Sequence, residues 1–242
     1  MTLTACLPSH CIGVERTSAD LPAQELLYRY SLGLAPFPAG RQGFTWCFFD
    51  PPAGAFVGDF RVPRRLRKTV RRQPYRVTAN TAFEDTVAHC AGAERHGGWI
   101  TDGIIEAALR LHNAGHAHSI EVWQGRDLVG GLYGVAVGQV FVGESMFTLA
   151  DNAGAIAATH LLSRLYHGGY SLLDTQVVSL HMQRFGMRAH DKADFMPRRW
   201  AAVSAPAGDF GPDGDDEHGP VSAFLNTITH PSSGAGASHA QI

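Results

Sequence analysis

Cysteines and charged residues are both scarce in this sequence. Four cysteines occur in 242 residues and none forms a Cys-x-x-Cys pair, which excludes a disulfide scaffold, a zinc ribbon and a thioredoxin-like redox motif. Charged residues make up 17% of the chain and the net charge is −2, so the molecule as a whole is neither a polycation nor an acidic tail protein. We therefore expect a protein of a reducing compartment, the cytoplasm.

Long apolar segments are also missing. The N-terminus has neither a basic region nor a sustained apolar run, which argues against a signal peptide. The longest uncharged stretch between residues 20 and 200, residues 128–143, contains five glycines and is short for a membrane span. We expect no membrane association.

The composition predicts an ordinary globular core, with 45% hydrophobic residues. A Pro-Pro-Ala-Gly segment near residue 50 indicates a boundary between a small N-terminal α/β domain over 1–50, with a weakly ordered start, and a catalytic domain over 51–200. Residues 201–242 hold acidic side chains among Gly, Pro and Ser and no Lys or Arg. They predict a disordered acidic tail, in which 221–228 could dock locally.

Hydrophobic periodicity predicts alternating helices and strands. Helices are expected over 21–33, ended by Gly33, over 102–113, and from Asn152 to Gly168, whereas strands are expected over 118–124, on both sides of Gly138, and over 171–178. The segment 35–43, with two prolines, is expected to break regular structure. This order predicts an α/β fold with a mixed sheet.

A basic run is the strongest charge feature. Residues 61–76 contain eight of the twenty Lys and Arg residues and no acid. One interpretation is a solvated helical face, and the other is a phosphate-binding surface, because clustered cations release the counterions of a nucleic acid. Tyr75, Trp46, Phe48 and Phe49 lie close in sequence and could stack on unpaired bases.

The sequence contains two patterns that resemble a serine-hydrolase nucleophile and a metal site, but neither is complete. Gly143-Glu-Ser-Met-Phe147 resembles a nucleophile elbow, but Phe147 stands where that sharp turn needs glycine. His112, His116 and His118 lack a further ligand at a convincing spacing, so we expect no metal site.

Three polar residues interrupt apolar strands. Glu144 ends one run, and Asp174 and Gln176 lie two residues apart in another, which would place them on the same face of a strand. Buried polar groups cost free energy unless paired, so these side chains either satisfy one another or line a cleft.

At this point the sequence resembles the bacterial leucyl/phenylalanyl-tRNA–protein transferases. The matching motifs run in order from residue 99 to 177: Trp99-Ile-Thr, Leu111-His-x-x-Gly-His-Ala-His-Ser-Ile-Glu-Val-Trp123, Val129-Gly-Gly-Leu-Tyr-Gly-Val135, Gly143-Glu-Ser-Met-Phe147, Gly168-Gly169 and Leu173-Asp-x-Gln-Val177. Pro74-Tyr-Arg-Val-Thr78, Asp20-Leu21 and Leu26-Leu-x-x-Tyr30 extend the resemblance to most of 20–200.

The resemblance implies a fold and an activity. It implies an acetyltransferase-like (GNAT) mixed-sheet domain preceded by a small N-terminal α/β domain. Such enzymes move Leu or Phe, and in some cases Met, from aminoacyl-tRNA to the α-amine of proteins with N-terminal Arg or Lys, which creates an N-end rule degradation signal. We expect Leu-tRNA and Phe-tRNA as partners, no cofactor, and a monomer.

The resemblance also implies roles for individual residues. Gln176, with Asp174 behind it, assists removal of the amine proton, and Glu144 organises the site through hydrogen bonds. The terminal adenosine contacts Trp99 and Phe37, and Met146 lines the pocket for the Leu or Phe side chain. The acceptor-stem phosphates bind the cations of the basic run: Arg64, Arg65, Lys68, Arg71 and Arg72.

The chain departs from the family pattern near its N-terminus. The family's Phe-Pro-Trp is replaced by Ala35-Pro36-Phe37, and its Trp-Trp-Ser-Pro by Trp46-Cys47-Phe48-Phe49. Of the family's Gly-Gly-Asp segment, this chain keeps Asp20 alone. A phenylalanine offers less stacking area than tryptophan and no indole N–H. These differences concern tRNA docking more than the chemical step.

Three other functions stay open. A related transferase places Leu on N-terminal Asp or Glu, and its sequence pattern is close. An N-acetyltransferase of the same fold would need a glycine-rich pyrophosphate loop, but the corresponding segment 150–155 has one glycine, an acid and no nearby cation. A non-catalytic RNA-binding protein would bind tRNA without turnover.

Overall fold

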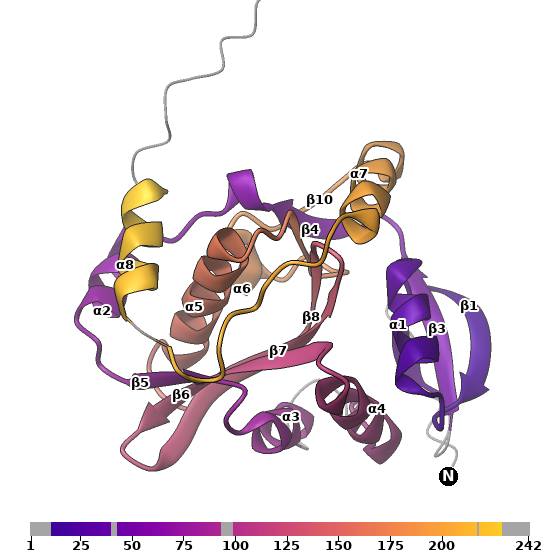
Figure 1. Ribbon diagram of the computed structural model, residues 1–242, viewed down its shortest axis with the longest axis horizontal. Coiled ribbons are helices and arrows are strands. Elements are labelled where there is room, and N and C mark those ends of the chain that lie inside the picture. Colours follow the sequence, from indigo (N-terminus) through magenta and orange to yellow (C-terminus); the bar gives the residue numbers. More distant parts are fainter. Residues whose placement is uncertain (1–10, 40–42, 93–98, 217, 229–242) are drawn as a thin grey trace, which may run out of the picture.

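The protein is a mixed α/β molecule with two sheets (Figure 1). The computed structural model describes residues 11–39, 43–92, 99–216 and 218–228. The smaller sheet has the strand order β1-β3-β2 and is antiparallel throughout. Its elements are β1 (Cys11–Ser18), β2 (Ala35–Pro38) and β3 (Gly43–Phe49), with helix α1 (Ala23–Ser31) between β1 and β2.

Helix α1 and strand β2 show how local sequence forms this small sheet. Leu26 and Tyr30, four residues apart, form the buried face of α1, and Gly33 ends the helix with a φ of +85°, as predicted. The expected break over 35–43 is wrong in part, because 35–38 form β2. This strand tolerates Pro36 and Pro38 because it lies at the edge of the sheet.

The larger sheet has the order β10-β4-β9-β8-β7-β6-β5-β11. Neighbouring strands are antiparallel except for β8 and β9, which are parallel and joined by helix α5 (Ala153–His167). The predicted mixed sheet is confirmed. Its strands are β4 (Ala53–Phe56), β5 (Arg76–Ala79), β6 (Ala117–Gln124), β7 (Asp127–Val137), β8 (Val140–Thr148), β9 (Leu172–Asp174), β10 (Arg188–Ala189) and β11 (Gly214–Asp215).

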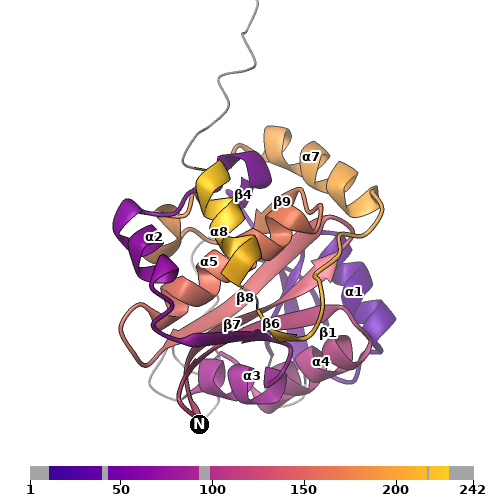
Figure 2. The ribbon, with the colours of Figure 1, turned by 60° about the vertical axis from the view of Figure 1, so that its left-hand side comes forward.

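Helices cover both faces of the larger sheet (Figure 2). The remaining ones are η1 (Val57–Asp59), α2 (Arg64–Arg71), α3 (Phe83–Ala91), α4 (Asp102–Asn113), α6 (Leu180–Gln183), α7 (Lys192–Ser204) and α8 (His218–Thr227). One hydrophobic cluster joins α2, α5 and α8 to the sheet residues Ile120 and Val122. A second cluster joins α1, α3, α4 and α7 to the opposite face, around Tyr133.

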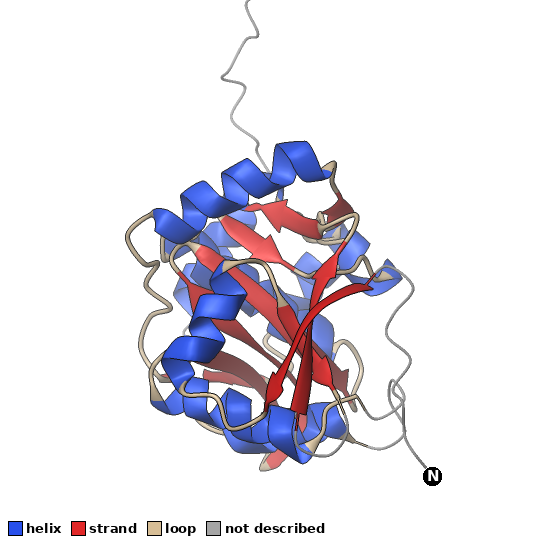
Figure 3. Cartoon of the chain, turned by 90° about the vertical axis from the view of Figure 1, so that its right-hand side faces the viewer, coloured by secondary structure: helices blue, strands red, loops and turns tan. Residues whose placement is uncertain are grey.

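The two sheets share a core. The chain leaves the small sheet at Phe49 and enters the large one at Ala53, next to the predicted boundary at residue 50. Phe44 and Trp46 from β3 belong to the same hydrophobic cluster as residues of α3, α4 and β7. The small sheet therefore packs on the α4 side of the larger one (Figure 1), and this side of the molecule faces the viewer in Figure 3.

Cysteine pairing adds one link within the small sheet. Cys11 of β1 and Cys47 of β3 form a disulfide with a Cα–Cα distance of 5.7 Å. The sequence excluded a disulfide scaffold, and this single cross-link between two paired strands does not make one. Within the described ranges, none of the helices combines the length and the apolar character that a membrane crossing needs.

The C-terminal segment corrects the expectation of a disordered acidic tail, as far as residue 228. Helix α7 continues to Ser204, β11 pairs with β5, and α8 packs on α5 by burying Val221, Phe224 and Leu225. The acidic composition predicted disorder wrongly, because acidic residues of this segment pair with residues of the folded part. Asp215, for example, pairs with Arg76.

Among the acids of this segment that the structure describes, Asp216 is the most buried. It accepts hydrogen bonds from Arg164 at 2.8 Å and bonds to His160, both on α5. Burial raises the pKa of Asp216, but the hydrogen bond and charge of His160 and the charge of Arg164 outweigh burial and lower it overall. Because Asp216 and Arg164 are both buried, separating them would leave an uncompensated charge in the interior. Their ion pair therefore holds the segment around Asp216 against α5.

Candidate active site

Glu144 occupies an irregularity in β8. Gly134 of β7 is opposite Gly143, whereas Tyr133 is opposite Ser145, so Glu144 has no residue directly across from it. A bulge of this kind redirects a side chain and is common next to active sites. The neighbouring parallel strand β9 brings Asp174 opposite Val142, two residues before Glu144.

Asp174 and Gln176 meet through a turn. Strand β9 ends at Asp174, and Gln176 has a left-handed φ of +61°, so the predicted strand over 171–178 is too long and the alternation argument for a shared face is wrong. Instead, the backbone N–H of Gln176 donates to Asp174 Oδ1 at 3.0 Å. A left-handed conformation is unfavourable for glutamine, and this side chain-to-backbone bond stabilises it.

Gln176 then reaches Glu144. Its Nε2 donates to Glu144 Oε1 at 3.4 Å. The structure therefore brings together all three side chains that the sequence singled out as interruptions of apolar strands. Of the two interpretations left open, mutual satisfaction holds for the pair Gln176 and Glu144.

Sequence reasoning missed a residue of this cluster, Arg199 of α7. Its Nε donates to Asp174 Oδ2 at 2.8 Å, and the two residues are only 1% and 6% exposed. Two charges this buried are tolerated because they are paired. The sequence around Arg199 does not indicate that it pairs with Asp174, because nothing there distinguishes Arg199 from the adjacent Arg198.

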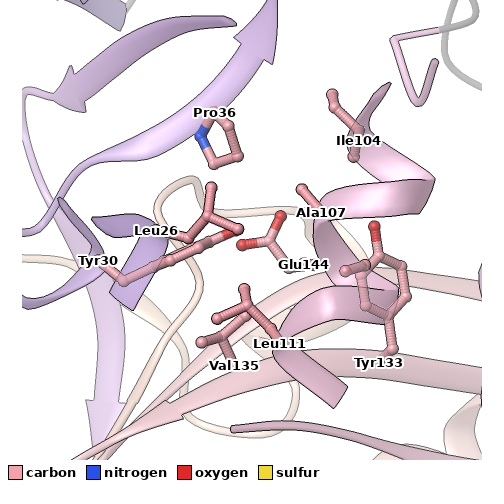
Figure 4. A pocket seen from close by; sticks show the side chains of 10 residues that line it. Leu26, Tyr30, Pro36, Ile104, Ala107, Leu111, Tyr133, Val135 and Glu144 are labelled. Carbon is pink, nitrogen blue, oxygen red and sulfur yellow. The ribbon is translucent and has the colours of Figure 1, made fainter. Parts of the chain in front are cut away.

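Glu144 faces a small cavity. The cavity, about 10 Å³ in volume, is lined largely by apolar side chains of α1, α4 and β7 (Figure 4). Figure 4 shows the carboxyl of Glu144 pointing into it, with the ring of Tyr30 beside it. The lining residues are Leu26, Tyr30, Pro36, Ile104, Ala107, Ala108, Leu111, Tyr133, Val135 and Glu144.

These surroundings raise the pKa of Glu144 to about 7. Burial is the main cause, hydrogen bonds from Tyr30 and Gln176 act in the opposite direction, and the charge of Asp174 adds to the increase. Burial and the nearby Glu144 raise the pKa of Tyr30 well above its ordinary value, so its hydroxyl keeps its proton and can donate. A carboxyl with a pKa near 7 can exchange a proton at neutral pH.

A second feature is an aromatic pair, neither member of which lines this cavity. The rings of Phe37 and Trp99 are stacked, with centroids 5.5 Å apart and planes at 29°. Pro36, the neighbour of Phe37 in β2, lines the same cavity as Glu144. The two residues predicted to contact adenosine are therefore brought together, although Phe37 lies in β2 and Trp99 in the loop before α4.

Met146 points to another part of the fold. It lies in β8 opposite Leu132, and its side chain packs against the cluster that contains α5. A Cβ on Gly154, in the first turn of α5, would lie 2.2 Å from Thr148 Oγ1, 2.9 Å from the Phe147 carbonyl oxygen and 3.2 Å from Met146 Sδ, so the start of α5 packs closely on this part of β8. Met146 is thus partly buried beside the start of α5.

The basic residues form a separate surface. Leu66 and Val70 are the buried face of α2, and the five predicted phosphate ligands are exposed: Arg64, Arg65, Lys68, Arg71 and Arg72. None of these five forms an ion pair with a described acidic residue, whereas Arg71 donates to Asn226 of α8 at 2.8 Å. Helix α2 lies across the molecule from α1 (Figure 1), so it does not join the Glu144 cluster.

Two of the three histidines considered as metal ligands, His112 and His118, instead make contacts within the fold. His112 bonds to the carbonyl of Ala117 at 2.8 Å and stacks on Phe83, and His118 stacks on Phe210. Within the described ranges, no group of three or more His, Cys, Asp or Glu side chains could hold a metal ion.

Comparison with known proteins gives a consistent answer. The family model described as leucyl/phenylalanyl-tRNA protein transferase matches residues 55–199. The chain is 46% identical to the leucyl/phenylalanyl-tRNA–protein transferase of Maricaulis maris over 180 residues, which cover 73% of this chain and 83% of that relative. It is 42% identical to the Ectopseudomonas mendocina protein of the same name (76% and 82% covered) and 38% identical to that of Pseudoalteromonas atlantica (82% and 88% covered). The chain therefore belongs to the leucyl/phenylalanyl-tRNA–protein transferase family and is an aminoacyltransferase.

Proposed function

We propose that this enzyme transfers Leu or Phe from aminoacyl-tRNA to the α-amine of proteins with N-terminal Arg or Lys, and that the product is an N-end rule degradation signal. The hydrogen-bonded cluster of Glu144, Gln176 and Asp174 carries the proposal, because it places a carboxyl of pKa about 7 beside an oriented amide. The family relationship and the stacked Phe37–Trp99 pair support an aminoacyl-tRNA donor.

The reaction is aminolysis of an ester. The amine nitrogen attacks the ester carbonyl, a C–N bond forms, the bond from the carbonyl carbon to the tRNA 3′-oxygen breaks, and a proton moves from nitrogen to that oxygen. Gln176 orients the amine by hydrogen bonding, since an amide is too weak a base to remove a proton. Glu144 accepts the proton, because its pKa is close to that of a peptide α-amine, about 8. Positioning the two reactants supplies much of the remaining acceleration.

The acceptor preference follows from charge. Arg199 already neutralises Asp174, so the charge that can act on a substrate is that of ionised Glu144, which favours a cationic N-terminal residue over an acidic one.

We also propose a GNAT-type architecture for the larger sheet. Its support is the parallel β8–β9 pair, joined by α5, with the irregularity at Glu144 in the first of the two strands. We propose that the enzyme acts as a cytoplasmic monomer without a cofactor, so acetyl-CoA should produce no thermal shift.

A transfer assay tests the proposal. Radiolabelled Leu-tRNA and Phe-tRNA are offered separately with matched peptides that begin with Arg, Lys, Asp or Glu. We expect transfer to the Arg and Lys peptides from both donors. Transfer to Asp or Glu peptides alone would keep the chemistry and overturn the proposed acceptor, and tRNA binding without any transfer would overturn the activity of this chain.

The exposed cations of α2 are proposed to bind the acceptor-stem phosphates. Replacing Arg71 and Arg72 together by alanine should weaken tRNA binding about tenfold or more and lower the slope of log Kd against log salt by about two, one for each lost phosphate contact. Filter binding at several salt concentrations measures both quantities. Arg16→Ala, an exposed arginine of β1, is the matched control, and an unchanged salt slope in the double variant would place the RNA elsewhere.

A further inference from the structure

The Glu144 cluster is part of a closed ring of contacts. Arg199 donates to the carbonyl of Tyr30 and to Asp174, Asp174 accepts from the N–H of Gln176, and Gln176 donates to Glu144. The side chain of Tyr30 closes the ring, since it lies beside the Glu144 carboxyl in the same cavity (Figure 4). Tyr30 therefore contacts both ends of the cluster, one with its backbone and the other with its side chain.

Arg199 uses all three guanidinium nitrogens in this ring. Nε donates to Asp174 Oδ2 at 2.8 Å, Nη1 to the carbonyl of Ser31 at 2.9 Å, and Nη2 to the carbonyl of Tyr30 at 2.7 Å. The two carbonyls lie at the C-terminal end of α1, where a helix presents the negative end of its dipole. The planar guanidinium group donates in three fixed directions, which match the positions of these three acceptors. A lysine ammonium is a compact charge and cannot reach all three at once.

We propose that Arg199 is a positioning residue for the transfer reaction. It fixes Asp174 from one side, and Asp174 in turn holds the left-handed turn that aims Gln176 at Glu144. It also anchors α1, whose Tyr30 binds the Glu144 carboxyl. The inference rests on the proposed roles of Asp174 and Gln176.

The two oxygens of Asp174 explain why the arginine matters for geometry. Oδ1 accepts from Gln176 and Oδ2 accepts from Arg199, so the orientation of the carboxylate is determined by both donors. Without Arg199 the carboxylate loses one of these restraints in a site that is 6% exposed. Small errors in the position of a reacting group cost large factors in rate, whereas binding of tRNA on α2 does not depend on this contact.

The experiment compares four variants: Arg199→Lys, Asp174→Asn, the double variant, and Arg198→Lys as the control. Arg198 is the exposed neighbour of Arg199 on α7. Single-turnover transfer rate, KM for the peptide, tRNA Kd and thermal unfolding are measured for each. We expect Arg199→Lys to lower the rate about 100-fold with KM and Kd within about twofold, and Arg198→Lys to match the wild type.

The double variant separates positioning from a general structural role. Because Arg199 acts through Asp174, Arg199→Lys should lower the rate by less than about threefold in the Asp174→Asn background. A further 100-fold loss there, or full activity of Arg199→Lys beside an inactive Asp174→Asn, would overturn the inference. Full activity of Asp174→Asn itself would instead overturn the proposed catalytic assignment on which the inference rests.

A second approach covers the case in which Arg199→Lys fails to fold. Arg199→Ala leaves a space that added methylguanidinium can fill, and we expect it to recover at least tenfold in single-turnover rate at tens of millimolar. The same addition should not help Arg199→Ala in the Asp174→Asn background. Equal recovery in both backgrounds, or no recovery in a folded Arg199→Ala, would contradict a role through Asp174.

Discussion

Replacing Gln176 by alanine, or Asp174 by asparagine, should lower the single-turnover transfer rate about 100- to 1,000-fold while tRNA binding stays within about twofold. Gln176→Ala removes the amide that bonds to Glu144 at 3.4 Å. Asp174→Asn leaves one acceptor oxygen for two donors, the N–H of Gln176 and Nε of Arg199, so one of them faces an NH₂ group. Both changes disturb the same hydrogen-bonded unit.

Single-turnover transfer from saturating Leu-tRNA measures the chemical step apart from binding. Asp127→Asn, an exposed aspartate at the start of β7, controls for a change of charge on the surface. Because the two residues act as a unit, the double variant should lose little more than either single one. Near-normal rates in both single variants would remove Gln176 and Asp174 from the catalytic assignment.

The sequence revealed three members of this cluster, but neither Arg199 nor the arrangement of the four side chains. Glu144, Asp174 and Gln176 stand out because each interrupts an apolar strand, and a buried polar group needs a partner. Strand periodicity could not show that Gln176 leaves the strand with a φ of +61°. That conformation depends on the carboxylate of Asp174, which is a local contact that periodicity does not encode.

Contacts between distant segments were beyond sequence reasoning. Arg199 is separated by 168 residues from Ser31, whose carbonyl it binds, and nothing near either residue indicates the contact. The prediction of disorder for the acidic segment after residue 205 was wrong for the same reason, because Asp216 pairs with Arg164, 52 residues earlier. Composition treats such charges as solvated, whereas the fold gives Asp215 and Asp216 specific partners.

Glu144 offers the second large effect, since its pKa of about 7 links activity to pH. Transfer requires both a neutral acceptor amine and an ionised Glu144, so the rate should rise with pH. Below about pH 6.5 both groups are mainly protonated, and the logarithm of the single-turnover rate should rise with a slope near two. Glu144→Gln should lower the rate at pH 8 about 100-fold and reduce this slope to one, which leaves the titration of the amine alone.

The same pKa predicts an opposite effect on stability. Unfolded Glu144 ionises near its ordinary value of 4.5, whereas the folded protein keeps the proton up to about 7. The folded state therefore loses stability as pH rises from 4.5 through 7, because a buried carboxyl must ionise. Glu144→Gln should match the wild type in thermal unfolding near pH 4.5 and exceed it at pH 8 by on the order of 2 kcal/mol, a value reduced for partial exposure of the residue.

Together the two measurements separate a proton acceptor from a merely polar residue. Glu84→Gln, an exposed glutamate of α3, should change neither the slope of the pH–rate profile nor the pH dependence of unfolding. A gain in stability at pH 8 with an unchanged slope of two would show that Glu144 is buried as described but does not accept the proton. A change in slope with no gain in stability would mean that water reaches the carboxyl, so that burial does not set its pKa.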